Sequence, residues 1–284
     1  MSEQRTVLVT GASTGIGEAC AVELDRLGFQ VFPGVRRQED ADRLAGRMSH
    51  RTLPILADVT DAASVSAAAE KIGSVVGSRG LDGLVNNAGI VVAGPIELLP
   101  IGDLRTQLEV NVLGQIAVTQ AMLPLLRRAQ GRLINMSSIS GCIASPFLGP
   151  YAASKFALEA LNDALRLELR RWNIEVSIIE PGSVKTPIWE KARAMADNLA
   201  GKIDADSAAL YHADAESFRQ AFAKVADKAI PVHHVVRAVV HALTAPRPRT
   251  RYRVGLDARL GVPLVKMLPD RWRDYLVKKE LGLR

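Results

Sequence analysis

The chain has 284 residues, of which 48% are hydrophobic and 23% charged, with a formal net charge of +6. This composition excludes a disordered chain and fits a packed α/β protein. The positive excess lies late in the chain without interleaved aromatic residues or a helix-turn-helix pattern, so we expect solvated surface there and no nucleic-acid partner.

Short apolar runs alternate with longer helical runs, which predicts βαβ units and a parallel sheet. Seven strands are predicted, at residues 5–11, 29–36, 51–59, 81–89, 131–138, 174–182 and 250–255. Helices are predicted at residues 16–27, 62–76, 103–129, 151–171 and 231–245. Pro33 lies inside the second strand and predicts a local irregularity, because proline cannot donate to a ladder.

The rhythm changes after Pro181, where residues 185–230 are alanine-rich and helical in pattern. No linker, repeat or low-complexity block separates this part from the rest. We therefore expect one domain over residues 1–284, with a doubly wound Rossmann-type sheet, helices on both faces and a helical C-terminal extension. Residues 185–284 would supply its substrate-covering and C-terminal elements.

A glycine-rich loop, "TGASTGIG" at residues 10–17, follows the first strand and opens the first helix. Glycine allows a sharp turn and close approach of the backbone to a pyrophosphate, and a helix N-terminus favours negative charge. In this position the loop predicts a dinucleotide site rather than a tight turn alone.

The glycine spacing G-x-x-x-G-x-G resembles that of the short-chain dehydrogenase/reductase family. The resemblance extends in unbroken order over residues 5–190, and several stretches are closest to the retinol and hydroxysteroid dehydrogenase branch. Its further motifs follow strand ends or lie on helices: Asp58 in "LADVTD", "NNAG" at 86–89, Asn111 in "NVLG", Ser138, Tyr151 with Lys155, and "PGSVKT" at 181–186. Membership implies an NAD(P)-dependent oxidoreductase.

The same resemblance implies which residues hold the dinucleotide. They are Gly11, Ser13, Thr14, Gly15, Ile16 and Gly17 of the loop, Asp58 and Val59 at the adenine, Asn87, Ala88 and Gly89 at the adenosine ribose, and Pro181, Gly182, Val184 and Thr186 at the nicotinamide, with Tyr151 and Lys155 beside it. All follow the carboxyl ends of strands, where an open parallel sheet forms its ligand crevice.

The end of the second strand predicts a preference for NADP(H). "GVRR" at residues 34–37 has Val35 where NAD-users of the family usually carry an acid, and Arg36 and Arg37 follow. An arginine can grip the 2′-phosphate with charge-assisted hydrogen bonds, and we expect Arg36 to be the principal contact. NAD(H) stays open if Glu39 or Asp40 reaches the ribose instead.

Tyr151 and Lys155 stand one helical turn apart, so the ammonium is expected to lower the pKa of the phenol and fit it for acid–base work. The resemblance implies four catalytic residues. Tyr151 exchanges a proton with the substrate oxygen, Ser138 hydrogen-bonds the same oxygen, Lys155 holds the nicotinamide ribose, and Asn111 supports a water path behind the lysine. Tyr275 and Lys279 repeat the spacing but lack a serine-bearing strand end.

The resembling branch implies a bulky apolar alcohol or ketone, such as a steroid, retinoid or lipid-like compound. Segments 142–150 and 184–195 carry few charges and suit an apolar pocket. The expected substrate contacts are Ser138, Cys142, Phe147, Leu148, Tyr151, Ile188 and Trp189. Each apolar member has the alternative of packing in the core.

Residues 257–284 mix apolar and basic residues, as interfacial amphipathic segments do. Pro263 and Pro269 interrupt any long helix, so we favour packing over the pocket or a subunit contact in a homo-oligomer above membrane contact.

The cysteines and histidines indicate the redox setting and the absence of metal chemistry. Two distant cysteines, Cys20 and Cys142, favour a reducing cytoplasm. No apolar run is long enough to span a membrane and no secretory signal is readable. The histidines lack metal-ligand spacing, so no metal is expected. The alternative function is a catalytically silent NADP-binding redox sensor or interaction module.

Overall fold

Seven parallel strands form the centre of the computed structural model, which describes residues 4–201 and 203–283. The strands are β1 (Thr6–Val9), β2 (Gln30–Val35), β3 (Ile55–Leu56), β4 (Gly83–Asn86), β5 (Arg132–Met136), β6 (Glu175–Pro181) and β7 (Arg251–Val254). Their order in the sheet is β3-β2-β1-β4-β5-β6-β7. The order reverses between β1 and β4, as a doubly wound sheet requires, which confirms the predicted fold class.

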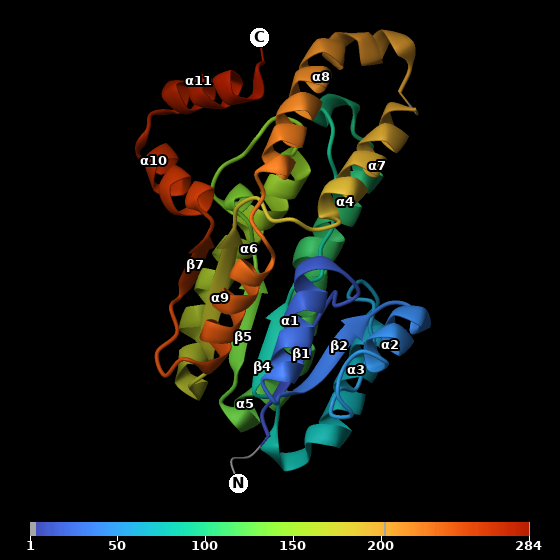
Figure 1. The fold of residues 1–284 in the computed structure, drawn as a ribbon, viewed down its shortest axis with the longest axis vertical. Helices are drawn as coiled ribbons and strands as arrows, with labels where there is room; N and C mark the ends of the chain where they lie inside the picture. Colours follow the sequence, from blue (N-terminus) through green and yellow to red (C-terminus); the bar gives the residue numbers. More distant parts are fainter. Residues whose placement is uncertain (1–3, 202, 284) are drawn as a thin grey trace.

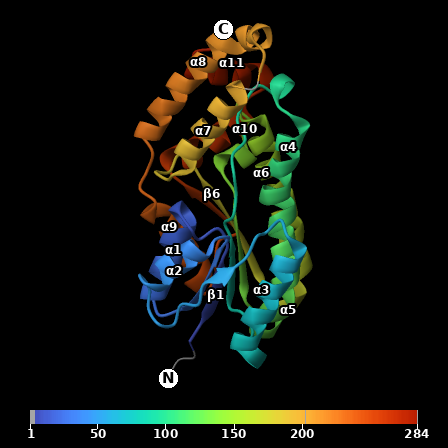
Figure 2. The ribbon, with the colours of Figure 1, turned by 90° about the vertical axis from the view of Figure 1, so that its right-hand side faces the viewer.

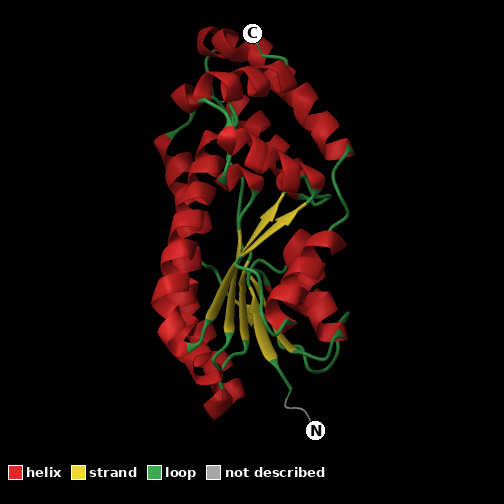
Figure 3. Cartoon of the chain, turned by 90° about the vertical axis from the view of Figure 1, so that its left-hand side faces the viewer, coloured by secondary structure: helices red, strands yellow, loops and turns green. Residues whose placement is uncertain are grey.

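Helices cover both faces of the sheet, as Figures 2 and 3 show. One layer contains α1 (Gly15–Arg26), α2 (Gln38–Ala45) and α9 (His233–Thr244), and the other contains α3 (Ala62–Val76), α4 (Ile101–Leu108), α5 (Gly114–Ala129) and α6 (Gly149–Glu168). Each face has its own cluster of buried apolar side chains. The strands are accordingly apolar on both faces, as they are in sheets covered on both sides.

The second strand runs through Pro33 without a break, so the predicted irregularity is wrong for β2 itself. The effect of Pro33 is seen in the neighbouring strand, β3. The carbonyls of Val31 and Val35 accept hydrogen bonds from the N–H groups of Leu53 and Ala57, on the β3 side of the strand. Pro33, midway between them, has its backbone nitrogen on the same side, and because proline has no N–H, one hydrogen bond to the β3 segment is missing. With Pro54 next to it, β3 is reduced to two residues instead of the predicted nine.

The helix predicted at residues 103–129 is divided into α4 and α5 by the π-helical segment Glu109–Leu113. Such an interruption widens one turn and redirects the side chains on it, and it is frequent at functional sites. The sequence pattern also missed α2, whose eight residues are mostly polar and bury only Asp40, Ala41 and Leu44.

Apart from α9 and β7, the helices of the C-terminal third lie above the carboxyl ends of the strands in Figure 1. They are α7 (Ile188–Ala200), α8 (Ala205–Asp227), the π-helical turn Asp257–Gly261, α10 (Val262–Met267) and α11 (Asp270–Leu281). Residue 284 of the predicted C-terminal segment lies outside the described residues. Among the residues that the structure describes, no helix is both long and apolar enough to cross a bilayer.

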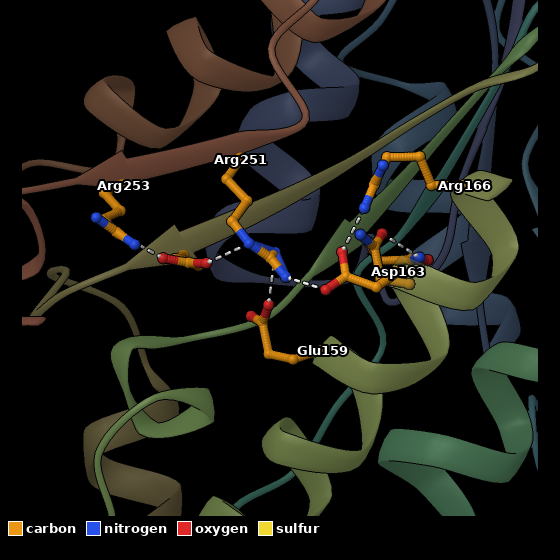
Figure 4. Close-up of polar contacts among 8 residues, drawn as sticks. Glu159, Asp163, Arg166, Arg251 and Arg253 are labelled. Atoms are coloured by element: carbon orange, nitrogen blue, oxygen red, sulfur yellow. Dashed lines mark hydrogen bonds and ion pairs between the residues drawn. The ribbon is translucent and has the colours of Figure 1, made fainter. Parts of the chain in front are cut away.

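A network of charged side chains, centred on the buried carboxylates of Glu159 and Glu180, ties the edge strand β7 to its neighbours (Figure 4). The Arg251 guanidinium lies 3.0 Å from Glu159 and 2.7 Å from Asp163, both on α6. Glu180, whose side chain is fully buried on β6, lies 3.7 Å from Arg251 and 3.0 Å from Arg253. Because buried carboxylates are costly without partners, the two arginines hold β7 in its register.

Arg251→Gln should therefore lower the free energy of unfolding by about 3 kcal/mol, because it leaves buried carboxylates without their shared cation. The measurement is urea unfolding of the full chain. Arg166→Gln is the matched control, since its pair with Asp163 is 34% and 46% exposed and should cost less than about 1 kcal/mol. Equal losses for the two variants would contradict the assignment.

Candidate active site

The glycine loop is packed tightly against the end of β4. Gly11 and Gly15 have φ of +63° and +64°, which side-chain-bearing residues rarely adopt. A Cβ on Gly11 would stand 2.7 Å from Ala88 Cα, and one on Gly17 would stand 2.3 Å from the Gly11 carbonyl oxygen. Glycine at these positions is therefore required by the fold, and it brings the loop backbone to the edge of the sheet.

Hydrogen bonds fix the loop in this place. The Thr10 hydroxyl accepts bonds from the backbone N–H groups of Asn87 and Ala88, at 2.9 and 3.1 Å. The Asn87 amide donates back to the carbonyls of Thr10 and Gly11, at 3.0 and 3.2 Å. The "NNAG" motif thus supports the glycine loop, and the side chain of Asn87 is already engaged in doing so.

Helix α1 starts at Gly15 with its first turn available to an anion. Its N-cap residue, Thr14, makes no capping hydrogen bond to the helix. Uncapped N–H groups and the helix dipole give this end a positive character. The Thr186 side chain lies 3.4 Å from the Cβ position of Gly15, so the "PGSVKT" segment faces the loop. The loop and this segment form the two sides of one crevice.

Two basic residues that the sequence motifs do not contain also reach the loop. Arg43 on α2 donates to the Ser13 carbonyl and pairs with Glu18 at 2.7 Å. Lys191 on α7 donates to the Thr14 hydroxyl at 3.2 Å. Their partners are 30 and 177 residues away in the sequence, so no local pattern could have identified them.

The two arginines after β2 differ in their surroundings. Arg37 is paired with Asp40 at 3.0 Å, and Asp40 is buried. Arg36 is exposed, and it forms no ion pair within the described part of the chain. A backbone hydrogen bond from Thr60 lowers the pKa of Asp58, and the positive charge of Arg36 adds to this effect. Arg36 and Asp58 therefore flank one end of the crevice, while Asp40 is engaged by Arg37.

Ser138, Tyr151 and Lys155 meet at the end of β5. Ser138 follows the strand and caps a short helical turn, where its hydroxyl accepts a bond from the Ser140 N–H at 3.1 Å. Lys155 is only 4% exposed and donates to the Met136 carbonyl at 2.8 Å. Its Nζ lies 5.7 Å from the centre of the Tyr151 ring. The structure thus brings together the three residues that the sequence predicted.

The electrostatics of this group differ from the prediction. Burial raises the pKa of the Tyr151 phenol, although its hydrogen bond with Ser138 acts in the opposite direction. Burial lowers the pKa of Lys155 to about 8, while the charge of Glu159 opposes the shift. The expected net lowering of the Tyr151 pKa is wrong for the free protein, because desolvation outweighs any effect of the Lys155 ammonium, which donates to the Met136 carbonyl. Tyr151 is therefore a neutral phenol, able to donate a proton.

Asn111 lies in the π-helical segment and is fully buried. Its carbonyl oxygen accepts a bond from the Ile90 N–H at 2.8 Å, and its amide donates to the Ile90 carbonyl and the Ser154 hydroxyl at 3.0 and 3.1 Å. Ser154 in turn donates to the Tyr151 carbonyl at 2.7 Å. These contacts link Asn111 to the helix that carries Tyr151 and Lys155.

A mostly apolar cavity of about 200 Å³ lies between α7, α8 and Phe147, four residues before Tyr151, and its described lining does not include Ser138, Tyr151 or Lys155. The Phe147 ring centre is 5.1 Å from that of Phe218, and Trp189 packs edge-on against Phe222 at 4.6 Å. Phe218 and Phe222 on α8 line the cavity but were not predicted, because the sequence does not show how α8 folds back over the crevice.

The expected substrate residues divide in the structure. Phe147 lines the cavity, whereas the other six, Ser138, Cys142, Leu148, Tyr151, Ile188 and Trp189, do not. Cys142 is buried behind the site, with its sulfur within 4.8 Å of carboxylate oxygens of Glu159 and Glu180. Because Arg251 and Arg253 already balance these carboxylates, this cluster belongs to the buried charge network.

The crevice fits a dinucleotide on three observations. The glycine loop turns at the strand edge with positive φ at Gly11 and Gly15, the first turn of α1 is uncapped, and Arg36 forms no ion pair among the described residues. The opposite wall is the Pro181–Thr186 segment, where Val184 accepts a bond from the Trp189 indole at 2.6 Å.

These features define a doubly wound nucleotide-binding fold with a proton-donating group at the carboxyl edge of the sheet. The family model for short chain dehydrogenases matches residues 5–197. The chain therefore belongs to the short-chain dehydrogenase family, and it is an oxidoreductase of the kind that acts on CH–OH and C=O groups.

Individual proteins are similar over nearly the whole chain. An NADPH-dependent 3-dehydrocapnine reductase of Ornithobacterium rhinotracheale is 37% identical, covering 98% of this chain and 97% of its own length. Retinol dehydrogenase 7 of Rattus norvegicus is 37% identical, covering 97% and 88%. A solved structure of a short-chain dehydrogenase from Streptomyces avermitilis matches with a TM-score of 0.76 and 28% identity, covering 99% and 97%.

Burial raises the pKa of Glu159 from 4.5 to about 7, so between these pH values the folded protein binds more protons at this group than the unfolded chain does. Its contribution to stability is thus greatest at the acidic end and falls as pH rises, by at most about 1.4 kcal/mol per pH unit. Glu159→Gln should remove this loss in urea unfolding followed across that range. Glu168→Gln, an exposed change on the same helix, should keep the parent slope; an unchanged slope in Glu159→Gln would refute the assignment.

Proposed function

We propose that the protein reduces the carbonyl group of a bulky apolar compound with NADPH, and that Tyr151 donates the proton. The observation that carries the proposal is the group formed by Tyr151, Ser138 and the buried Lys155 at the strand edge, with an apolar cavity lined by Phe147, four residues before Tyr151. When bound, the reduced nicotinamide supplies a hydride to the carbonyl carbon.

The residues of the chain then perform the proton chemistry and the positioning. The Ser138 and Tyr151 hydroxyls hydrogen-bond the substrate oxygen, and the Tyr151 proton passes to it as negative charge develops there. Lys155 holds the nicotinamide ribose and, with its positive charge, stabilises the phenolate that remains. Asn111 keeps α6 in place through Ser154 and supports the water path that returns a proton to the lysine side.

Reduction is favoured as the working direction because Tyr151 is neutral in the free protein. A phenol that keeps its proton at neutral pH has that proton available for a developing alkoxide, whereas taking a proton from an alcohol would require the phenolate. The NADPH dependence in the name of the Ornithobacterium relative supports the same direction.

NADP(H) is the preferred dinucleotide, and NAD(H) is a weaker alternative. Arg36 is exposed at the end of β2, where a 2′-phosphate would lie, and Asp40 on α2 is buried and bound to Arg37. A guanidinium that forms no ion pair among the described residues favours a phosphate over a hydroxyl. Lys191 and Arg43, at the glycine loop, would add to the binding of the pyrophosphate.

The substrate is proposed to be steroid-, retinoid- or lipid-like. The cavity is walled by Phe147, Phe218 and Phe222, and such aromatic surfaces gain most from burying a large apolar body. The retinol dehydrogenase relative acts, by its name, on a compound of this kind. A silent binding module has no support among the relatives, whose names are those of reductases and dehydrogenases.

Tyr151→Phe should lower kcat at least a hundredfold, because proton donation contributes roughly 10²- to 10⁴-fold to such reactions. NADPH binding, followed by fluorescence, should stay close to the parent value. Tyr275→Phe is the matched control, since that tyrosine has a lysine at the same spacing but is 57% exposed on α11. Parent-like turnover in Tyr151→Phe would disprove the role.

Arg36→Gln should raise the KM for NADPH by about tenfold to a hundredfold, as expected for a lost charged hydrogen bond, and leave the KM for NADH almost unchanged. Arg37→Gln should have the smaller effect on NADPH because Arg37 is held by Asp40. A parent enzyme that prefers NADH would contradict the NADP(H) assignment.

A panel of ketones of increasing apolar size should show the highest kcat/KM for the bulky members. Phe218→Ala should raise KM for these by roughly tenfold, by loss of buried apolar area, and change KM for small ketones little. Activity confined to small sugars would overturn the proposed substrate class while leaving the enzyme class intact.

A further inference from the structure

A second cavity, of about 470 Å³, lies where α9, β7 and the turn at 257–261 meet. Four arginines line it, each from a different part of the chain: Arg237 on α9, Arg249 in the following loop, Arg253 on β7 and Arg259 on the turn. None of the residues assigned to the active site contributes to this lining. The cavity therefore needs an explanation of its own.

Most of the positive charge in this cavity has no counterpart. Arg253 pairs with Glu180 at 3.0 Å, but Arg237, Arg249 and Arg259 form no ion pair with the residues that the structure describes. Asp257, the nearest acid along the chain, accepts bonds from the backbone N–H groups of Ser183 and Ala258 instead.

His234 also lines the cavity and accepts a hydrogen bond from Arg237 at 2.8 Å. Partial burial lowers its pKa, and the neighbouring His233, Arg237 and Arg259 add to this. The histidine in this contact is therefore neutral. Guanidinium groups converging in a concave site are the usual means of binding an oxyanion such as phosphate.

An apolar stripe begins at the rim of the cavity. Leu256 lines the cavity, and Leu256, Leu260, Leu264 and Met267 are 75%, 69%, 57% and 83% exposed. Their spacing places them along one side of the helical stretch 256–267. The opposite side of this stretch already packs against the protein, because Ala258 and Val262 are fully buried. The stripe is thus a second apolar face for which the fold provides no cover.

We propose that this face docks on a bilayer containing anionic phospholipid, with the stripe in the acyl boundary and a lipid phosphate in the basic cavity. Apolar residues next to unpaired cations match the two layers of such a membrane surface, the acyl chains and the anionic headgroups. Trp272 and Tyr275 on the adjacent α11 are 63% and 57% exposed, and these residue types are enriched at membrane interfaces.

Charge decides between a bilayer and a second copy of the chain. A symmetric dimer through this face would bring the three unpaired arginines of one copy close to the same residues of the other. Such like-charge contact opposes association, whereas an anionic surface complements it. The inference revises the preference for a subunit contact drawn from the proline positions, and it does not depend on the proposed reaction.

The test is sedimentation of the full chain with phosphatidylcholine vesicles, with and without phosphatidylglycerol. We expect binding to the vesicles that contain phosphatidylglycerol, weakening as salt is added, and little binding to phosphatidylcholine alone. The double change Arg237→Gln with Arg259→Gln should weaken binding about thirtyfold, since each basic residue near an anionic surface contributes about fivefold. Leu260→Ser with Leu264→Ser should abolish it.

Matched controls are Lys71→Gln with Arg79→Gln for charge and Leu27→Ser with Leu167→Ser for apolar exposure, all at exposed positions on other elements. Both should bind like the parent, and circular dichroism of all variants should show the parent fold.

Three outcomes would overturn the proposal. The first is failure of the parent chain to sediment with anionic vesicles. The second is binding of soluble glycerol phosphate by the arginine pocket without vesicle binding, which would indicate a free-phosphate site. The third is a parent dimer that Leu260→Ser with Leu264→Ser converts to monomer, with vesicle binding unchanged, which would indicate a subunit interface.

Discussion

The hydrogen bond between the buried Lys155 ammonium and the Met136 carbonyl, at 2.8 Å, fixes α6 against the end of β5. A charge this deeply buried is held only where an acceptor is available, so the bond determines how the helix sits on the sheet. Tyr151, one turn earlier, is thereby placed against Ser138 at the same strand end. The electrostatic character of both titratable groups follows from that shared burial.

The rest of the crevice depends on how the parallel strands end. The carboxyl ends of β1, β4, β5 and β6 lie at one edge, so motifs separated by long stretches of sequence become neighbours. Close packing of Gly11 and Gly17 against the "NNAG" segment allows the loop to lie at that edge. The charge network around Arg251 then secures the outermost strand, from which the C-terminal elements continue over the crevice.

Sequence reasoning predicted the fold and the grouping of Ser138, Tyr151 and Lys155 because both follow from strand order. A residue just after a predicted parallel strand has its place in the sheet fixed by topology alone. The same reasoning missed Arg43, Lys191, Phe218 and Phe222, since they reach the crevice through contacts between elements distant in the chain. It also placed Cys142 toward the substrate, although the strand-end turn directs it into the charge network.

The pKa of Tyr151 is a second property that the sequence could not predict, because it depends on desolvation in the folded protein. The i, i+4 spacing with Lys155 indicates a nearby positive charge, but spacing carries no information on how much water the fold removes from the phenol. Pro33 is a comparable case, because its cost appears in the shortened β3 and not in the strand that contains it. Both effects depend on neighbours that only the folded structure supplies.

The protonation state of Tyr151 can be measured directly, because a neutral proton donor must keep its phenol proton in the free protein. Titration of phenolate absorbance, taken as the difference between the parent chain and Tyr151→Phe, measures this group apart from the other three tyrosines. The difference signal should appear only above the ordinary tyrosine pKa of about 10. A phenolate signal assigned to Tyr151 near neutral pH would contradict it.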